Sequence, residues 1–214
     1  MLTIHNFARG ARGLRIMWQC EEMGLPYAAK IVTFPPSAEY RALHPLGSVP
    51  FLQDDSAGVT LGESVAILLY LANRYGPTPL LPARDAPQLA RVLHLAEFGE
   101  ATLGAGANAL IEAKYMAPEA DKDNWSVRAH RARLGRALTY LAGLLGEQEF
   151  LAGTQLTLAD ISVAPALGLC HGVLSLTLPG KLDAYQQRMQ ARPAWQRAQI
   201  RCRGEAPADA APRS

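Results

Sequence analysis

A proline-rich connector divides the chain, and the hydrophobic pattern differs in kind on its two sides. Residues 76–82 contain one glycine and three prolines, and residues of these types interrupt both helices and strands. Before the connector, short apolar segments with strand character alternate with helical segments, whereas after it strand patterns nearly vanish and long helical patterns follow. The sequence therefore predicts an α/β domain followed by an all-helical domain.

The first part of the chain opens with a strand, a helix and a second strand. We expect strands at residues 2–7 and 27–34 around a helix at 14–23, which Gly24 and Pro26 end. A short helix at 38–43, two strands that follow Pro50 and are joined through residues 55–58, and a helix at 64–75 complete this part. We place the domain at residues 1–77 and a linker at 78–86.

The second part, residues 87–202, is predicted to be helical throughout. We expect helices near 86–113, 125–145, 158–170 and 181–191, with a short helix at 193–198 and a bend in the first at Gly104 and Gly106. Thr157 and Asp160 have the spacing of a capping box, which we interpret as support for the fold, worth about 1 kcal/mol. Residues 203–214 lack the apolar content to order themselves and are predicted to form a loose tail.

Composition narrows the classes of partner. The 214 residues carry a net charge of only +2, so we expect neither nucleic acid nor an anionic membrane as a partner. The longest apolar stretch, residues 161–178, is interrupted by Pro165 and His171 and is interpreted as a core helix followed by a loop. The N-terminus lacks a signal-peptide pattern. The three cysteines form no Cys-x-x-Cys pair, so we expect no metal site and a cytoplasmic location.

Four segments stand in an order and spacing that together give the chain a family resemblance over about residues 1–200: Cys20–Tyr27, His44–Leu52, Leu61–Ile67 and Phe150–Ile161. The chain resembles the glutathione transferase family, which implies a thioredoxin-like N-terminal domain plus an all-α C-terminal domain. The resemblance also implies glutathione as co-substrate, a small apolar electrophile as second substrate, a role in detoxification, and a homodimer.

The glutathione site implied by this resemblance lies in the first domain. The Val49–Pro50 bond is expected to be cis, which leaves the Val49 backbone free to pair with the cysteinyl part of glutathione. Glu63 and Ser64, at a helix N-terminus, are expected to hold the γ-glutamyl ammonium and carboxylate. The alternatives are a trans proline at the head of a strand and a plain serine N-cap beside a surface acid.

The loop that precedes Pro50 supplies two further candidates. His44 is positioned to reach the carboxylate of the glycyl end of glutathione, with Ser48 beside it in the loop. The alternative for His44 is a solvated loop histidine.

The residue that activates the thiol is not the usual one. Most members of the family carry a Tyr, Ser or Cys in the turn after the first strand, but residues 8–15 contain neither a hydroxyl nor a thiol. We therefore predict Arg12 as the activator, helped by the Gly13 and Leu14 amides, with Arg9 in reserve, because a guanidinium stabilises a thiolate by charge and hydrogen bonding. The alternative is that these arginines are solvated or hold the glycyl carboxylate.

The second substrate is expected to meet Phe7, Tyr115 and Trp125. The alternative is that aromatic residues at helical spacing belong to the core. Two other functions remain open at the level of sequence: a glutathione-fold binding or regulatory protein without transferase activity, and a glutathione-dependent isomerase or lyase.

Overall fold

The structure, a computed structural model, describes residues 1–205, and its contacts divide the chain into two compact units. The first unit contains Met1–Thr78 together with the segment that begins at Gln190, and the second contains Pro79–Met189. The division falls inside the proline-rich connector. The predicted tail at 203–214 lies, from residue 206 onward, outside the described residues.

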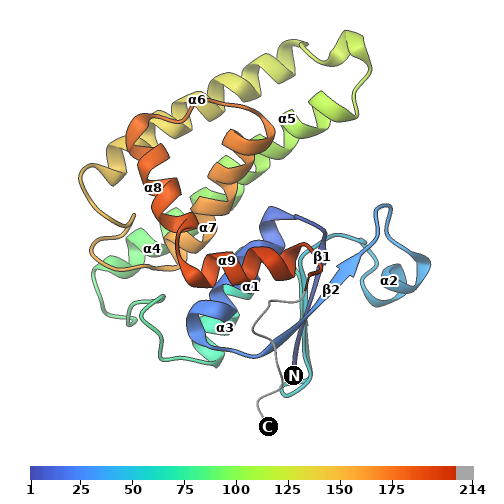
Figure 1. Ribbon diagram of the computed structural model, residues 1–214, viewed down its shortest axis with the longest axis vertical. Helices are drawn as coiled ribbons and strands as arrows, with labels where there is room; N and C mark the ends of the chain where they lie inside the picture. The colour runs from blue at the N-terminus through green and yellow to red at the C-terminus, as the bar shows by residue number, and fades with distance from the viewer. Residues whose placement is uncertain (206–214) are drawn as a thin grey trace. The chain divides into compact units, whose positions relative to one another are not determined.

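The first unit is built on a four-stranded sheet. The strand order is β2-β1-β3-β4, with β1 parallel to β2 and the other pairs antiparallel. Figure 1 shows α1 and α3 with α9 beside them, and α2 on the other side of the strands. The elements are β1 (Leu2–Phe7), α1 (Ala11–Met23), β2 (Tyr27–Val32), α2 (Ala38–Leu43), β3 (Phe51–Asp54), β4 (Val59–Leu61), α3 (Ser64–Arg74) and α9 (Pro193–Cys202).

The C-terminal helix α9 belongs to the first unit by its contacts. Trp195 packs edge-on against Trp18 of α1 with 4.7 Å between ring centroids. Arg192 and Arg197 form ion pairs with Glu22 and Glu21, both at 2.7 Å. The sequence analysis placed this helix in the second domain because its helical pattern follows the helices of that domain. The hydrophobic pattern of a helix does not reveal which part of the protein the helix packs against.

The regular elements of the second unit are helical, and α4, η1 and α5 follow one another directly without an intervening loop. Its elements are α4 (Gln88–Glu97), the π-helical segment η1 (Phe98–Gly104), α5 (Ala105–Tyr115), the short η2 (Glu119–Asp121), α6 (Trp125–Leu145), α7 (Leu158–Gly168), η3 (Leu169–Val173) and α8 (Gly180–Gln190). The expected thioredoxin-like and all-α fold class is confirmed. Within residues 1–205, none of the helices combines the length and apolar character needed to cross a membrane.

The irregular part of the first long helix is η1, which ends at Gly104, one of the two glycines at which a bend was predicted, while Gly106 lies in α5. This segment comes closest to α7 at Gly99, where an added Cβ would lie 2.5 Å from the Ser162 Oγ. Ser162 in turn donates a hydrogen bond to the Ala96 carbonyl at 2.6 Å. Gly99 is therefore required by the packing of this segment against α7, a contact between positions 63 residues apart that the local pattern does not reveal.

The capping box at the start of α7 is present as predicted. The Asp160 Oδ2 accepts from the Thr157 amide at 2.9 Å, and the Oδ1 accepts from the Leu151 amide and the Tyr185 hydroxyl, each at 2.9 Å. Asp160 is fully buried. Burial raises the pKa of Asp160, against the lowering effect of these hydrogen bonds. The carboxylate is thus fully engaged in holding α7, the preceding loop and α8 together.

Candidate functional site

The N-terminus of α3 carries a buried polar pair. Ser64, the first residue of α3, is 2% exposed, and the Arg15 side chain of α1 is 1% exposed. An Arg15 Nη1 donates to the Ser64 Oγ at 2.9 Å. The guanidinium adds positive charge at a helix terminus that already favours anions. The arrangement suits the binding of a carboxylate.

Arg15 was missed by the sequence analysis, which singled out Arg12 and Arg9. The available signal was a charged residue inside the apolar pattern of the first helix, where Leu14, Ile16 and Met17 are all buried. A fully buried arginine is rare unless it is paired, so a charged residue in this pattern indicates a partner elsewhere in the fold. Only the packing of α1 against α3 identifies Ser64 as its partner.

Glu63 stands directly before this pair with a constrained backbone. Its φ is 60°, in the left-handed region that a non-glycine residue seldom adopts, and its side chain is exposed. Glu63 makes no side-chain hydrogen bond to the amides of α3. It is therefore placed beside the helix terminus as an exposed acid, the arrangement expected of a residue that pairs with an ammonium.

Val49 and Pro50 lie immediately before β3. The bond between them is cis, as the family resemblance implies. The β1–β3 ladder begins at the His5–Phe51 pair, so the Val49 backbone lies outside it. The Val49 side chain packs with Phe7 against the small core cluster of Val32, Tyr40 and Phe51. The Val49 side chain is thus held in the core, while its backbone lies outside the hydrogen-bonded β1–β3 ladder.

The loop before Pro50 is held by its own side chains. The His44 Nε2 lies 3.0 Å from the Ser48 Oγ, and the His44 ring stacks on Phe51 at 4.6 Å between centroids. The Tyr40 hydroxyl donates to the Ser48 carbonyl at 2.7 Å. Burial raises the pKa of Tyr40 to about 12, so this hydroxyl stays protonated at neutral pH. His44 is packed rather than simply solvated, and it is half-buried at the edge of the loop.

The start of α1 holds the residues predicted to activate a thiol. Arg12 is half-buried in the first turn, whereas Arg9 is exposed, with a φ of 63° and its amide bonded to the Cys202 carbonyl at 3.0 Å. The Leu14 amide donates to the Gly10 carbonyl at 3.1 Å. The expected help from the Leu14 amide is therefore wrong, because that donor already serves the helix.

Gly13 is fixed by close packing against the first strand. A Cβ added there would fall 2.1 Å from the Cγ of Asn6, and one added at Gly10 would fall 2.8 Å from the Asn6 Oδ1. Asn6 is fully buried, and its Oδ1 has no hydrogen-bond partner among the described residues. The glycines therefore allow the first turn of α1 to lie directly on Asn6. A packing role for Gly13 is sufficient to explain why the residue is glycine.

Cys202, which the sequence analysis did not connect with this turn, lies against it. The Asn6 Nδ2 donates to the Cys202 Sγ at 3.2 Å, and the thiol donates to the Gly10 carbonyl at 3.5 Å. Burial raises the pKa of Cys202 to about 11, so the thiol is protonated at neutral pH. Its distance in sequence hid it: Cys202 and Gly10 are 192 positions apart.

The three residues predicted to meet a second substrate fall in different units. Phe7, in the first unit, packs edge-on against Phe34 at 5.4 Å. Tyr115 and Trp125, in the second unit, are 62% and 74% exposed, so they are not core residues. Their shared role stays a prediction. Across residues 1–205, no cluster of three or more His, Cys, Asp or Glu side chains is arranged to hold a metal ion.

Comparison with known proteins identifies the family. Residues 12–74 match the N-terminal domain model of glutathione S-transferases, and residues 109–205 match the C-terminal domain model. The chain therefore belongs to the glutathione S-transferase family. A curated relative, the glutathione S-transferase GstB of Escherichia coli, is 26% identical over 202 residues, which is 91% of this chain and 95% of the relative.

Solved structures agree with this assignment. A glutathione transferase from Methylococcus capsulatus aligns with a TM-score of 0.83 and 26% identity, covering 94% of this chain and 98% of that one. A theta-class glutathione S-transferase from Xanthomonas axonopodis pv. citri, solved with glutathione bound, aligns with a TM-score of 0.75 and 28% identity, covering 93% and 97%.

Proposed function

We propose that this protein is a glutathione transferase that binds glutathione in its first unit and activates the thiol for attack on small apolar electrophiles. The observation that carries the proposal is the buried Arg15–Ser64 pair at the N-terminus of α3. A buried cation that supports a serine at a helix terminus is suited to the γ-glutamyl carboxylate. Glutathione in the Xanthomonas relative supports the same choice of ligand.

The other proposed site residues each bind a different part of glutathione. Glu63 pairs with the γ-glutamyl ammonium, and the Val49 backbone pairs with the cysteinyl backbone in the manner of an added strand. His44 and Ser48 take the glycyl carboxylate, where their mutual hydrogen bond orients the imidazole. The sulfur then lies toward the first turn of α1, which carries Arg12 and, ahead of it, Arg9.

The chemistry requires a thiolate at neutral pH. A free thiol has a pKa near ~8.5, and a neighbouring guanidinium and a helix N-terminus both stabilise the anion. With Arg12 beside the sulfur, the proton leaves to solvent. The thiolate attacks the electrophilic carbon to form a C–S bond, while the leaving group departs with its electron pair. Placement of the two substrates supplies the rest of the rate enhancement.

The test is a titration of glutathione into the protein across pH 5 to 9, followed by the ultraviolet absorbance of the bound thiolate. We expect binding with a thiol pKa lowered by about one unit, equivalent to about 1.4 kcal/mol. Ser64→Ala should weaken binding, whereas Ser37→Ala is the matched control, because Ser37 caps the exposed helix α2 in the same unit. Absence of binding would overturn the proposal.

A second candidate, a glutathione-binding protein without transferase activity, is favoured by one observation. Residues 8–15 lack a hydroxyl or thiol, and the nearest cysteine found in the structure, Cys202, is buried with a pKa of about 11. Binding of glutathione with an unshifted thiol pKa would select this candidate over the transferase.

A further inference from the structure

The peptide unit that joins Ser48 to Val49 is held by the protein at one end only. Its carbonyl, which belongs to Ser48, accepts a hydrogen bond of 2.7 Å from the Tyr40 hydroxyl of α2. The N–H of the same unit belongs to Val49, and within residues 1–205 it donates to no hydrogen bond. The carbonyl end is therefore bonded inside the protein, whereas the N–H end is open to a partner from solution.

The direction of the Val49 N–H follows from the direction of the Ser48 carbonyl. A peptide unit is planar, and in the trans form its C=O and N–H point in opposite directions. The Ser48–Val49 bond is not among the cis bonds of the described chain, so it is trans. Because the carbonyl points toward the Tyr40 hydroxyl, the Val49 N–H points away from it.

Tyr40 is itself fixed by the rest of the first unit. Its side chain is 6% exposed and forms a small core cluster with Val32 and Phe51. Its amide donates to the Ser37 Oγ at 3.2 Å, and its carbonyl accepts from the His44 amide at 2.8 Å. The position of the hydroxyl is thus set by α2 and the core of the first unit.

We propose that Tyr40 is a positioning residue for glutathione, because it fixes the Ser48–Val49 peptide with the Val49 N–H directed toward the cysteinyl carbonyl of the ligand. This inference rests on the proposed function, which assigns the Val49 backbone to the cysteinyl part of glutathione. Tyr40 acts through the peptide rather than through a contact of its own with the ligand. The hydrogen bond at the carbonyl also polarises the peptide, which makes its N–H a stronger donor.

The first measurement uses the full chain without ligand. Tyr40→Phe removes only the hydroxyl, and Tyr70→Phe is the matched control, because its hydroxyl bonds the carboxylate at the end of β3 in the same unit. Amide nitrogen relaxation should show a more mobile Val49 N–H in Tyr40→Phe and an unchanged one in Tyr70→Phe. A Val49 N–H as ordered in Tyr40→Phe as in the parent protein would overturn the proposal.

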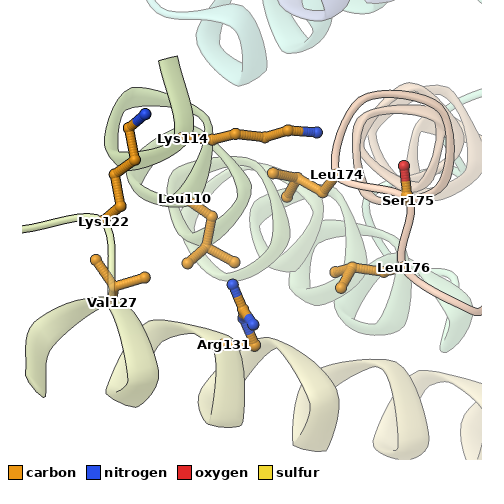
Figure 2. Close-up of a pocket in the computed structure, with 8 residues that line it drawn as sticks. All are labelled: Leu110, Lys114, Lys122, Val127, Arg131, Leu174, Ser175 and Leu176. Carbon is orange, nitrogen blue, oxygen red and sulfur yellow. The ribbon is translucent and has the colours of Figure 1, made fainter. Parts of the chain in front are cut away.

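The second unit supplies an internal reference for this measurement. Leu110 and Val127 line a cavity of about 530 Å³ there, as Figure 2 shows. Their amides report on a general loosening of the fold, and we expect them to keep the mobility of the parent protein in both variants. Greater mobility of these amides together with Val49 in Tyr40→Phe would contradict a local role for Tyr40.

The second measurement is the calorimetric titration of glutathione, combined with the ultraviolet absorbance of the bound thiolate. Tyr40→Phe should weaken binding about fivefold, the effect of one hydrogen bond, and leave the pKa of the bound thiol unchanged. Tyr70→Phe should keep the affinity of the parent protein. Unchanged affinity in Tyr40→Phe, or equal losses in both variants, would overturn the role of Tyr40 in binding.

Failure of the proposed function gives a different result. A parent protein that does not bind glutathione would overturn that function, and the mobility of Val49 would still decide whether Tyr40 fixes the peptide.

Discussion

The N-termini of α3 and α7 are both buried, yet their polar groups are used in opposite ways. At α7 the capping partners come from the chain itself, since Asp160 accepts hydrogen bonds from Thr157, Leu151 and Tyr185. At α3 the residue before the helix, Glu63, makes no side-chain hydrogen bond to the helix amides, and Ser64 accepts a hydrogen bond from the buried Arg15. The N-terminus of α7 is thus capped by the Asp160 carboxylate, whereas the buried Arg15 guanidinium adds positive charge at the N-terminus of α3.

The contrast separates support of the fold from binding. A helix N-terminus favours an anion in either case. Where the sequence provides that anion, as at Asp160, the terminus stabilises the native state and has nothing left to offer a ligand. Where it provides Arg15 and Ser64 instead, the proposed partner is the γ-glutamyl carboxylate. Substitutions at the two sites should therefore separate stability from affinity.

The largest effect is expected for Asp160→Asn. The amide removes the negative charge and replaces one acceptor oxygen by an NH₂ donor that faces the Leu151 or Thr157 amide. The free energy of unfolding should therefore fall by about 3 kcal/mol. Urea denaturation measures this change, with Asp123→Asn at the exposed surface as control. Glutathione affinity of the folded variant should stay near that of the parent protein. A large loss of affinity without a loss of stability would break the comparison.

The opposite signature is expected for Arg15→Met. Methionine fills a similar volume without charge, so glutathione binding should weaken by about 2 kcal/mol, roughly thirtyfold, through loss of the charged hydrogen bond to Ser64. Calorimetric titration measures the affinity, and exposed Arg74→Met on α3 is the control. A double-mutant cycle with Ser64→Ala should give strong coupling. Additive effects would show that the two residues act separately.

Two buried carboxylates, Asp54 of β3 and Asp160 of α7, should affect the stability of the fold differently as the pH falls. Burial alone would raise the pKa of Asp54, but hydrogen bonds from Ser56, Tyr75 and Tyr70 outweigh it and hold the pKa well below its usual value. Since the folded-state pKa lies below the unfolded value near ~3.9, ionised Asp54 stabilises the fold above about pH 4 and loses that effect as pH falls.

Asp54→Asn should therefore cost about 1.5 kcal/mol at pH 7 and progressively less below pH 4. Urea unfolding at a series of pH values checks this. Asp160, whose pKa is raised by burial, should not show the same acid-dependent loss. A pH-independent cost for Asp54→Asn would contradict the lowered pKa.

The smallest expected effect concerns the thiol itself. Arg12→Ala should raise the pKa of bound glutathione by about one unit, or about 1.4 kcal/mol, with little change in stability, because Arg12 is only half-buried. The pH–rate profile with an apolar electrophile measures it, and Arg41→Ala on α2 is the control. An unchanged profile would exclude Arg12 as the activator and leave Arg9 to be tested.

Prediction from the sequence succeeded where the signal was local. The bounds of α2 and α6 match the expected helices, and the Thr157–Asp160 capping box is present as its spacing indicated. Ser64 lies where expected, at the first residue of α3. Prediction was incomplete for Arg15, Cys202 and Gly99, whose partners are 49, 192 and 63 residues away in the chain.

The sequence by itself determined the division into an α/β part and a helical part, the order of the elements and the family. These follow from periodicity, turn residues and short motifs, which act over a few residues. The tertiary structure decided that α9 joins the first unit and that the Arg15 side chain donates a hydrogen bond to Ser64. Such contacts depend on which surfaces pack together, and burial and charge at a site are set by neighbours that are remote in the chain.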